Sequence, residues 1–179
     1  MTQALLVIDV QESFRSTERW STISDPEVLP RVAELVDRFR DAGAPVFWIL
    51  HSDPGSGGDF DPASGLVRVA APLAPAPEEP VMVKTTINSF TSTDLEQRLR
   101  DAGVDRLVLC GIRTEQCVET TARIATDLGF DTTVVIDATA TNPAGALSAQ
   151  QVIERTAEVL AAREFARVVT LDELAHPVG

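Results

Sequence analysis

The chain has 179 residues, of which 44% are apolar and 23% are charged, and its formal net charge is −12 at pH 7. This length suits one globular domain, so we expect a single domain over residues 1–179. The acidic excess argues against nucleic acid or an anionic membrane surface as a partner, because either would need a basic face. No apolar run approaches the roughly 20 residues of a membrane span.

The first ten residues, MTQALLVIDV, have neither the basic region nor the small-residue cleavage site of a signal peptide. They are typical of a first core strand, and we therefore expect a cytoplasmic protein. Only two cysteines occur, Cys110 and Cys117. With no secretion signal, this pair gives little reason to expect a structural disulfide.

Apolar runs of strand length alternate with helical patterns along the chain. The run ALLVIDV (4–10) is continuous, as expected of a parallel strand buried on both faces. The pattern 25–43 begins with Asp25 and Pro26 and ends at Gly43, which are typical helix start and stop signals. Strands are predicted at 4–10, 45–50, 80–84, 105–111, 131–138 and 166–171, and helices at 25–43, 92–103, 117–129 and 148–163.

This alternation predicts an α/β fold of three layers, α-β-α, that is Rossmann-like. Its sheet should be mostly parallel with five to six strands, because βαβ crossovers build parallel sheets with helices on both faces. No Gly-rich dinucleotide fingerprint is present, and we expect no cofactor. Residues 52–79 are irregular and rich in Gly, Pro, Asp and Ala, and long loops of this kind are usually functional or mobile.

Polar residues stand at the ends of several predicted strands, where parallel sheets bind ligands. Asp9 ends the first strand, His51 follows the second and Lys84 ends the third. Lys84 is also the only lysine beside fourteen arginines, and arginine cannot supply a compact ammonium that gives up its proton. The predicted topology thus brings a carboxylate, an ammonium and the Cys117 thiol to one edge of the sheet.

Cys117 suits a nucleophile because it stands where a helix is predicted to begin, with Thr114 or Glu115 as the cap. Unpaired N–H groups and the helix dipole there would favour a thiolate, and nearby Lys84 would lower the thiol pKa further. Asp9 could take the proton from the thiol and pass it to a leaving amine. The alternative is that Cys117 is a small packing residue.

Three stretches resemble the isochorismatase-like cysteine hydrolase family, which includes nicotinamidases and N-carbamoylsarcosine amidohydrolases. They are LLVIDVQESF (5–14), VKTTINSF (83–90) and GIRTEQCVETTARIATDLGF (111–130). The resemblance covers nearly the whole chain and implies a Rossmann-like sheet. It also implies an Asp-Lys-Cys triad, which falls on Asp9, Lys84 and Cys117.

The same resemblance implies a cis peptide bond between Ile112 and Arg113. That bond would turn the Arg113 N–H towards the site, where it would form an oxyanion hole with the Cys117 N–H. The family also suggests that the protein is a homodimer or a homotetramer whose subunit contacts close the pocket.

Nicotinamidases of this family bind a divalent metal through an Asp-x-His pattern and a further histidine. Here the stretch WILHSDPG offers His51 at the histidine position but Ile49 at the aspartate position. No other histidine occurs before His176, and one histidine makes a poor metal site. We therefore expect no metal, and His51 is either a pocket residue or an ordinary strand-end residue.

The small-molecule substrate is expected to contact side chains near the strand ends and the 52–79 loop. Arg113 replaces a small residue often found in the family, and it either selects an anionic substrate or points outward. Phe90 could equally be core, Trp20 could belong to a lid or a subunit contact, and Gln11 could orient Asp9 instead. The expected substrate-binding residues are Gln11, Phe14, Trp20, His51, Ser89 and Phe90.

The leading hypothesis is a metal-independent hydrolase that cleaves a carbon–nitrogen bond of a small amide, carbamoyl or lactam compound through a thioester. Cys117 favours it, because true isochorismatases characteristically lack the nucleophilic cysteine. Isochorismatase-type cleavage of a vinyl ether is the second hypothesis. The third is a non-catalytic reactive-thiol domain, for which Cys110 would be the only resolving cysteine.

Overall fold

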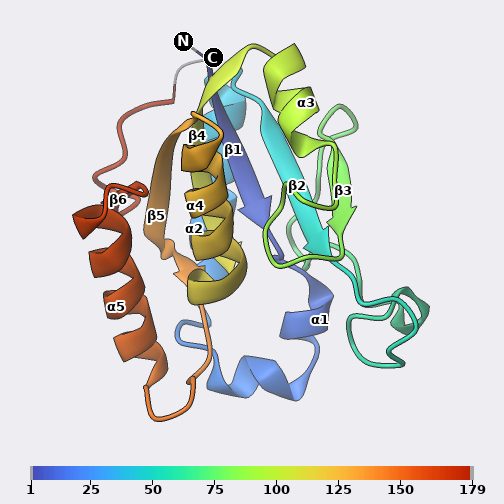
Figure 1. Ribbon diagram of the computed structural model, residues 1–179. Coiled ribbons are helices and arrows are strands. Elements are labelled where there is room, and N and C mark those ends of the chain that lie inside the picture. The colour runs from blue at the N-terminus through green and yellow to red at the C-terminus, as the bar shows by residue number, and fades with distance from the viewer. Residues whose placement is uncertain (1, 178–179) are drawn as a thin grey trace.

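The computed structural model describes residues 2–177, which form a six-stranded sheet with helices on both sides (Figure 1). The strand order is β3-β2-β1-β4-β5-β6, and every neighbouring pair is parallel. The predicted α/β class and Rossmann-like parallel sheet are therefore confirmed. The strands are β1 (Thr2–Ile8), β2 (Val46–His51), β3 (Val81–Lys84), β4 (Val104–Ile112), β5 (Asp131–Ala140) and β6 (Arg167–Val169).

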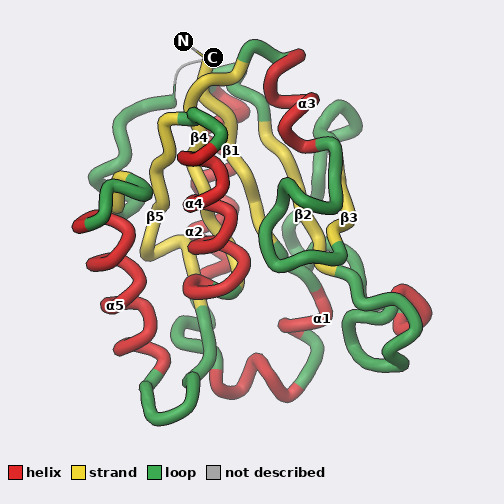
Figure 2. The backbone as a smooth tube through the Cα atoms, in the orientation of Figure 1, coloured by secondary structure: helices red, strands yellow, loops and turns green. Residues whose placement is uncertain are grey.

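Helices cover both faces of this sheet, as Figure 2 shows. One face packs against α2, and the other packs against α3, α4 and α5. None of the helices in residues 2–177 is long and apolar enough to cross a membrane. The helices are α1 (Glu12–Arg15), α2 (Val28–Asp41), α3 (Leu95–Asp101), α4 (Glu119–Asp127) and α5 (Ala149–Ala162), with single turns at η1 (Glu18–Thr22), η2 (Pro62–Ser64) and η3 (Thr114–Val118).

The buried faces follow from the spacing of apolar residues. In α2 the buried positions Val28, Val32, Leu35 and Phe39 recur every three or four residues, so that they form one stripe against the sheet. The strand β1 lies between β2 and β4, and all its residues from Ala4 to Ile8 are buried. A continuous apolar run is what a central strand covered on both faces requires.

The carboxyl ends of β1, β2 and β3 meet at one edge of the sheet, where α1 and the 52–79 segment also lie (Figure 1). The segment is irregular apart from η2, as predicted. Backbone hydrogen bonds hold it there, because the Glu12 N–H donates to the Arg68 oxygen at 3.0 Å and the Ala70 N–H donates to the Val10 oxygen at 3.0 Å. This edge carries the candidate site.

The ends of β1 and β4 approach each other unusually closely at Gly111. Its partner in the register is Ile8, and a Cβ at Gly111 would stand 1.9 Å from the Ile8 carbonyl oxygen. Gly111 also has φ of 127°, a conformation that only glycine adopts readily. The residue next to Ile8 is Asp9, whose φ of 54° is left-handed. This close approach places Asp9 beside the segment that follows β4.

Candidate active site

Three separate elements bring Asp9, Lys84 and Cys117 into contact. Asp9 follows β1, Lys84 ends β3 and Cys117 belongs to η3. Lys84 Nζ lies 2.8 Å from Asp9 Oδ2 and 3.4 Å from Cys117 Sγ. The side chains of Asp9 and Lys84 have no exposed surface. The structure thus assembles the three residues of the predicted triad, while their catalytic roles stay a prediction.

The Lys84 ammonium is surrounded by four acceptors, although it has only three N–H donors. Besides Asp9 and Cys117, it contacts His51 Nδ1 at 3.3 Å and the Thr86 carbonyl oxygen at 3.2 Å. Neither carboxylate oxygen of Asp9 has a hydrogen bond of good geometry among the described residues, although Oδ2 is held in the ion pair with Lys84. The lysine is therefore held at the centre of the cluster, and the carboxylate keeps a free position for a proton.

The pKa of Cys117 is raised to about 12, mainly by burial. The charge of Asp9 also raises this pKa, and its effect is larger than the lowering by the charge of Lys84. Burial also raises the pKa of Asp9, against the opposing charge of Lys84. The predicted low thiol pKa is therefore wrong. The helix end and Lys84 favour a thiolate, but the loss of solvent around Cys117, which is only 7% exposed, outweighs them. The raised pKa favours a thiol in the resting protein.

The helix start is also built differently from the prediction. Neither Thr114 nor Glu115 caps it, because η3 is a turn of π-helix without a side-chain cap. Instead, the Thr114 hydroxyl donates to Thr139 Oγ1 at 2.9 Å, and Glu115 accepts from the Thr141 hydroxyl at 2.6 Å. These bonds tie the turn that carries Cys117 to the end of β5.

The peptide bond between Ile112 and Arg113 is cis, as the family resemblance implies. The Arg113 carbonyl oxygen accepts hydrogen bonds from the N–H groups of Gln116 and Val118, each at 3.2 Å. The turn between β4 and α4 is thereby closed around Cys117. The oxyanion-hole role of the Arg113 and Cys117 N–H groups stays a prediction.

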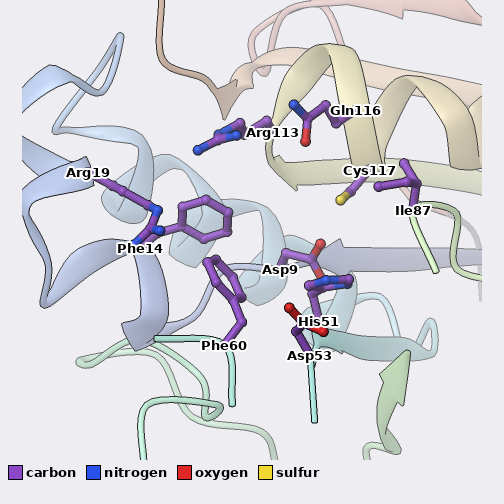
Figure 3. Close-up of a pocket in the computed structure, with 10 residues that line it drawn as sticks. All are labelled: Asp9, Phe14, Arg19, His51, Asp53, Phe60, Ile87, Arg113, Gln116 and Cys117. Carbon is purple, nitrogen blue, oxygen red and sulfur yellow. The ribbon is translucent and has the colours of Figure 1, made fainter. Parts of the chain in front are cut away.

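A pocket with a volume of about 220 Å³ opens over these groups (Figure 3). Of the residues predicted for the site, Asp9, Phe14, His51, Arg113 and Cys117 line it. The 52–79 segment also contributes to the wall. The remaining lining residues, for which no individual role was predicted, are Arg19, Asp53, Phe60, Ile87 and Gln116.

Gln11 and Trp20 do not line the pocket, which corrects their assignment to substrate binding. Gln11 is fully buried, and its side chain forms two hydrogen bonds with the backbone of His51. It accepts from the His51 N–H at 2.7 Å and donates to the His51 oxygen at 3.0 Å. Trp20 packs against the core on the α2 face, and its neighbour Arg19 lines the pocket instead. Gln11 therefore positions the end of β2.

Ser89 and Phe90 are likewise corrected, because neither lines the pocket. Ser89 is fully buried, and both its N–H and its hydroxyl bond to Thr121 Oγ1, at 3.0 Å and 3.1 Å. The Phe90 ring stacks on Phe130 with 6.1 Å between centroids, in the core beneath α3 and α4. Both residues thus hold the segment after β3 against the sheet.

His51 is half-buried at the pocket, and its ring meets the Phe60 ring edge-on at 5.7 Å. Burial and the Lys84 charge lower the pKa of its imidazole. The neutral ring can therefore accept a hydrogen bond from the Lys84 ammonium at Nδ1, which leaves Nε2 as the nitrogen that carries the proton. His51 is a pocket residue, which is one of the two alternatives that the sequence left open.

A metal site of the nicotinamidase type does not fit these residues. Ile49, at the position of the aspartate, is fully buried in the core and has no ligand atom. Within residues 2–177, no group of three or more His, Cys, Asp and Glu side chains is arranged to hold a metal ion.

No sequence pattern marked Arg19, Ile87 or Gln116 as residues of the pocket. Arg19 lies in the short turn η1, Ile87 in the irregular segment after β3, and Gln116 in η3. Their common signal is proximity in the chain to predicted site residues. Gln116 directly precedes Cys117, and Ile87 follows Lys84 by three positions.

A cysteine that contacts a buried Asp–Lys pair at the carboxyl edge of a parallel sheet defines a cysteine hydrolase of the α/β class. More particularly, the chain belongs to the isochorismatase family, because the model of the isochorismatase domain matches residues 3–173. It is 37% identical to isochorismatase family protein YddQ of Bacillus subtilis, over 79% of each chain.

Two further relatives have names that state an activity. Streptothricin hydrolase of Streptomyces noursei is 39% identical over 78% of this chain, which spans only 54% of that protein. Nicotinamidase 3 of Arabidopsis thaliana is 33% identical over 77% of this chain and 73% of that protein.

Solved structures agree with this family. An isochorismatase from Pseudomonas putida has a TM-score of 0.88 at 30% identity, covering 97% of this chain and 90% of the other. A cysteine hydrolase from Pseudomonas syringae pv. phaseolicola has a TM-score of 0.84 at 26% identity, covering 96% and 89%.

Proposed function

We propose that the protein is a cysteine amidohydrolase that cleaves a carbon–nitrogen bond of a small amide, carbamoyl or lactam compound without a metal. The observation that carries the proposal is the contact of Lys84 with both Asp9 and Cys117, at 2.8 Å and 3.4 Å, beneath a pocket of small-molecule size. A thiol, a carboxylate and a fixed cation are the groups that nucleophilic attack on an amide needs.

In the first half of the reaction, Asp9 takes the proton of the Cys117 thiol while the sulfur attacks the carbonyl carbon. The negative charge moves to the carbonyl oxygen, which the N–H groups of Arg113 and Cys117 would stabilise. Asp9 then returns the proton to the leaving nitrogen, the carbon–nitrogen bond breaks, and a thioester forms as the amine departs.

In the second half, a water molecule gives a proton to Asp9 and attacks the thioester. The carbon–sulfur bond breaks, the proton passes to the sulfur, and the carboxylic acid leaves. Each group of the protein then has its starting protonation state again.

The raised pKa values of Asp9 and Cys117 are compatible with this scheme because of Lys84. When the proton moves from sulfur to carboxylate, the negative charge moves from Asp9 to Cys117, and the ammonium contacts both groups. The total charge of the three groups is unchanged by the transfer. Fixed charges that meet the developing charge in a water-poor site are an effective form of catalysis.

The names of two relatives support hydrolysis of an amide. Nicotinamidase names an amide substrate, and streptothricin hydrolase names a hydrolysis. The homodimeric or homotetrameric state, the cytoplasmic location and the exclusion of nucleic acid and membrane partners stay predictions from the sequence.

The test is a panel of small amides, carbamoyl compounds and lactams assayed for release of ammonia or amine. Wild type should turn over at least one of them and form an acyl adduct on Cys117 that mass spectrometry detects. Cys117→Ser should lose both. Cys110→Ser is the matched control, because Cys110 is fully buried in β4 and does not line the pocket. Undiminished turnover by Cys117→Ser, or none by wild type, contradicts the proposal.

Vinyl ether hydrolysis is the second candidate, and the raised pKa of Asp9 favours it because a carboxyl group that keeps its proton can act as an acid. A relative of known structure is named an isochorismatase. Turnover of isochorismate that survives Cys117→Ala would support this candidate. The reactive-thiol hypothesis loses support, because its resolving residue Cys110 has no exposed surface.

A further inference from the structure

Two arginines line the pocket, and of these Arg113 is the one whose guanidinium forms no ion pair among the described residues. Its Nε donates to Asn142 Oδ1 at 3.1 Å. Among residues 2–177, no carboxylate forms an ion pair with it. An arginine has five N–H donors, so this contact leaves four of them for other partners. Arg19, the other arginine of the wall, is by contrast paired with Asp59, and Lys84 beneath the pocket is paired with Asp9.

Neighbouring groups hold this guanidinium in place. Asn142 is itself fixed, because its Nδ2 donates to the Arg19 oxygen at 2.8 Å and to Thr22 Oγ1 at 3.0 Å. The guanidinium carbon of Arg113 stands 5.4 Å from the centre of the Phe14 ring, which also lines the pocket. Figure 3 shows the side chain extending towards that ring rather than away from the pocket. Such an arginine is oriented before any ligand arrives.

The acidic groups of the pocket lie elsewhere. In Figure 3, Asp53 and His51 lie on the side of the pocket away from Arg113, and Asp9 lies between them and Cys117. Asp9 is compensated by Lys84, and the neutral His51 adds no charge. The end of the pocket at Arg113 therefore has a positive charge and no acidic group that neutralises it.

We propose that Arg113 binds a carboxylate of the substrate, so that the pocket takes small amides that also carry a carboxylate group. The inference rests on the proposed amidohydrolase function and names its substrate class. The planar fork of an arginine matches a carboxylate with two parallel hydrogen bonds, which lysine or a neutral side chain cannot supply. Since Arg113 stands four residues before Cys117, the bound carboxylate would hold the scissile amide at the sulfur.

The kinetic test uses three primary amides of similar size and different charge: succinamate, butanamide and 3-aminopropanamide. Wild type should prefer the anionic succinamate in kcat/KM. Arg113→Gln, which keeps the backbone N–H, should lower kcat/KM for succinamate by about 10- to 100-fold, the range of a charge-assisted hydrogen bond, and change butanamide much less. Arg113→Lys should retain part of the preference.

Arg98→Gln is the matched control for net charge. It removes one positive charge from the exposed side of α3, where Arg98 pairs with Asp94, and should leave the preference unchanged. A preference of wild type for butanamide or 3-aminopropanamide overturns the carboxylate site. An equal loss in Arg98→Gln and Arg113→Gln overturns it as well.

A binding titration separates this inference from the proposed function. Succinamate is titrated into Cys117→Ser and into Cys117→Ser/Arg113→Gln by calorimetry, with butanamide as the neutral probe. The first variant should bind succinamate at least about 10-fold more tightly than the second. If wild type turns over no amide, the proposed function fails, and this titration still decides the site. Equal affinities in the two variants overturn the carboxylate site even where amidase activity is present.

Discussion

Lys84 and Asp9 form an ion pair of 2.8 Å between two side chains that have no exposed surface. Removing one partner of such a pair leaves a buried charge without compensation. Lys84→Met should therefore lower the free energy of unfolding by about 3–5 kcal/mol at pH 8, measured by urea denaturation.

This loss should shrink as the pH falls. Without Lys84, the already raised pKa of Asp9 rises further in the folded state, so the folded protein binds a proton that the unfolded chain releases. Stability of the variant therefore decreases as the pH rises from the usual aspartate pKa of 3.8 through the raised value. Lys84→Met/Asp9→Asn should be more stable than Lys84→Met at pH 8. Equal losses in Lys84→Met and the surface variant Arg98→Met would contradict this account.

The Cys117 thiol should stay protonated in the folded protein at about pH 10, because burial raises its pKa to about 12 from the usual 9.0. Thiolate absorbance in the ultraviolet measures this directly in Cys110→Ser, where Cys117 is the only cysteine. The native sample should show no thiolate signal, whereas the urea-unfolded sample should show it.

The same shift makes the folded state less stable in alkali. Between pH 9 and pH 12 the unfolded chain loses the thiol proton and the folded protein keeps it, so stability decreases as the pH rises through that window. Cys110→Ser/Cys117→Ala should lack this part of the decrease, compared with Cys110→Ser. A native thiolate signal at neutral pH would contradict the prediction and restore the low pKa that the sequence suggested.

Periodicity and strand ends predicted the parts of this protein that depend on local pattern. All six strands and the helices α2, α3, α4 and α5 lie within a few residues of their predicted ranges. The strand-end rule located Asp9, His51 and Lys84, because the carboxyl ends of parallel strands share one edge. Short turns such as η1 were missed, since a single turn has too few residues to show a period.

The direction and depth of side chains were not predictable in the same way. Ser89 and Phe90 stand six residues or fewer from Lys84, yet they face the core on the α3 and α4 side. The thiol pKa depends on how much solvent the folded chain removes, which no local pattern records. Arg113 was left with two alternatives, and only the position of Phe14 and Asn142 showed that its side chain lines the pocket.

The neutral form of His51 should stabilise the folded protein through its contact with Lys84. Burial and the Lys84 charge lower the pKa of its imidazole below 6.5, so the folded state resists protonation where the unfolded chain accepts it. Stability should therefore decrease as the pH falls from 6.5 through the lowered value. His51→Gln should lack this decrease in urea unfolding at pH 5–7.

His176 provides the control for this effect, because it is the only other histidine and is exposed near the end of the described chain. His176→Gln should keep the acid decrease of wild type. If the two variants unfold alike across the pH range, the neutral His51 contact with Lys84 does not contribute to stability.

Gly111→Ala should disrupt the site more than any glycine substitution on the surface. The new Cβ would stand 1.9 Å from the Ile8 carbonyl oxygen, and neither backbone can move without separating β1 from β4. We expect a loss of more than about 3 kcal/mol in the free energy of unfolding, or no folded protein, since overpacking and backbone strain both act here.

Gly103→Ala is the matched control, because Gly103 also has a positive φ, of 66°, but no atom within 4 Å of the added Cβ. It should lose only about 1–2 kcal/mol, the cost of the left-handed conformation. Because Asp9 follows Ile8 directly, any folded Gly111→Ala should also release less ammonia from its best amide than Gly103→Ala does. Similar stability and activity in the two variants would show that β1 and β4 tolerate a wider separation than the contact between Gly111 and Ile8 implies.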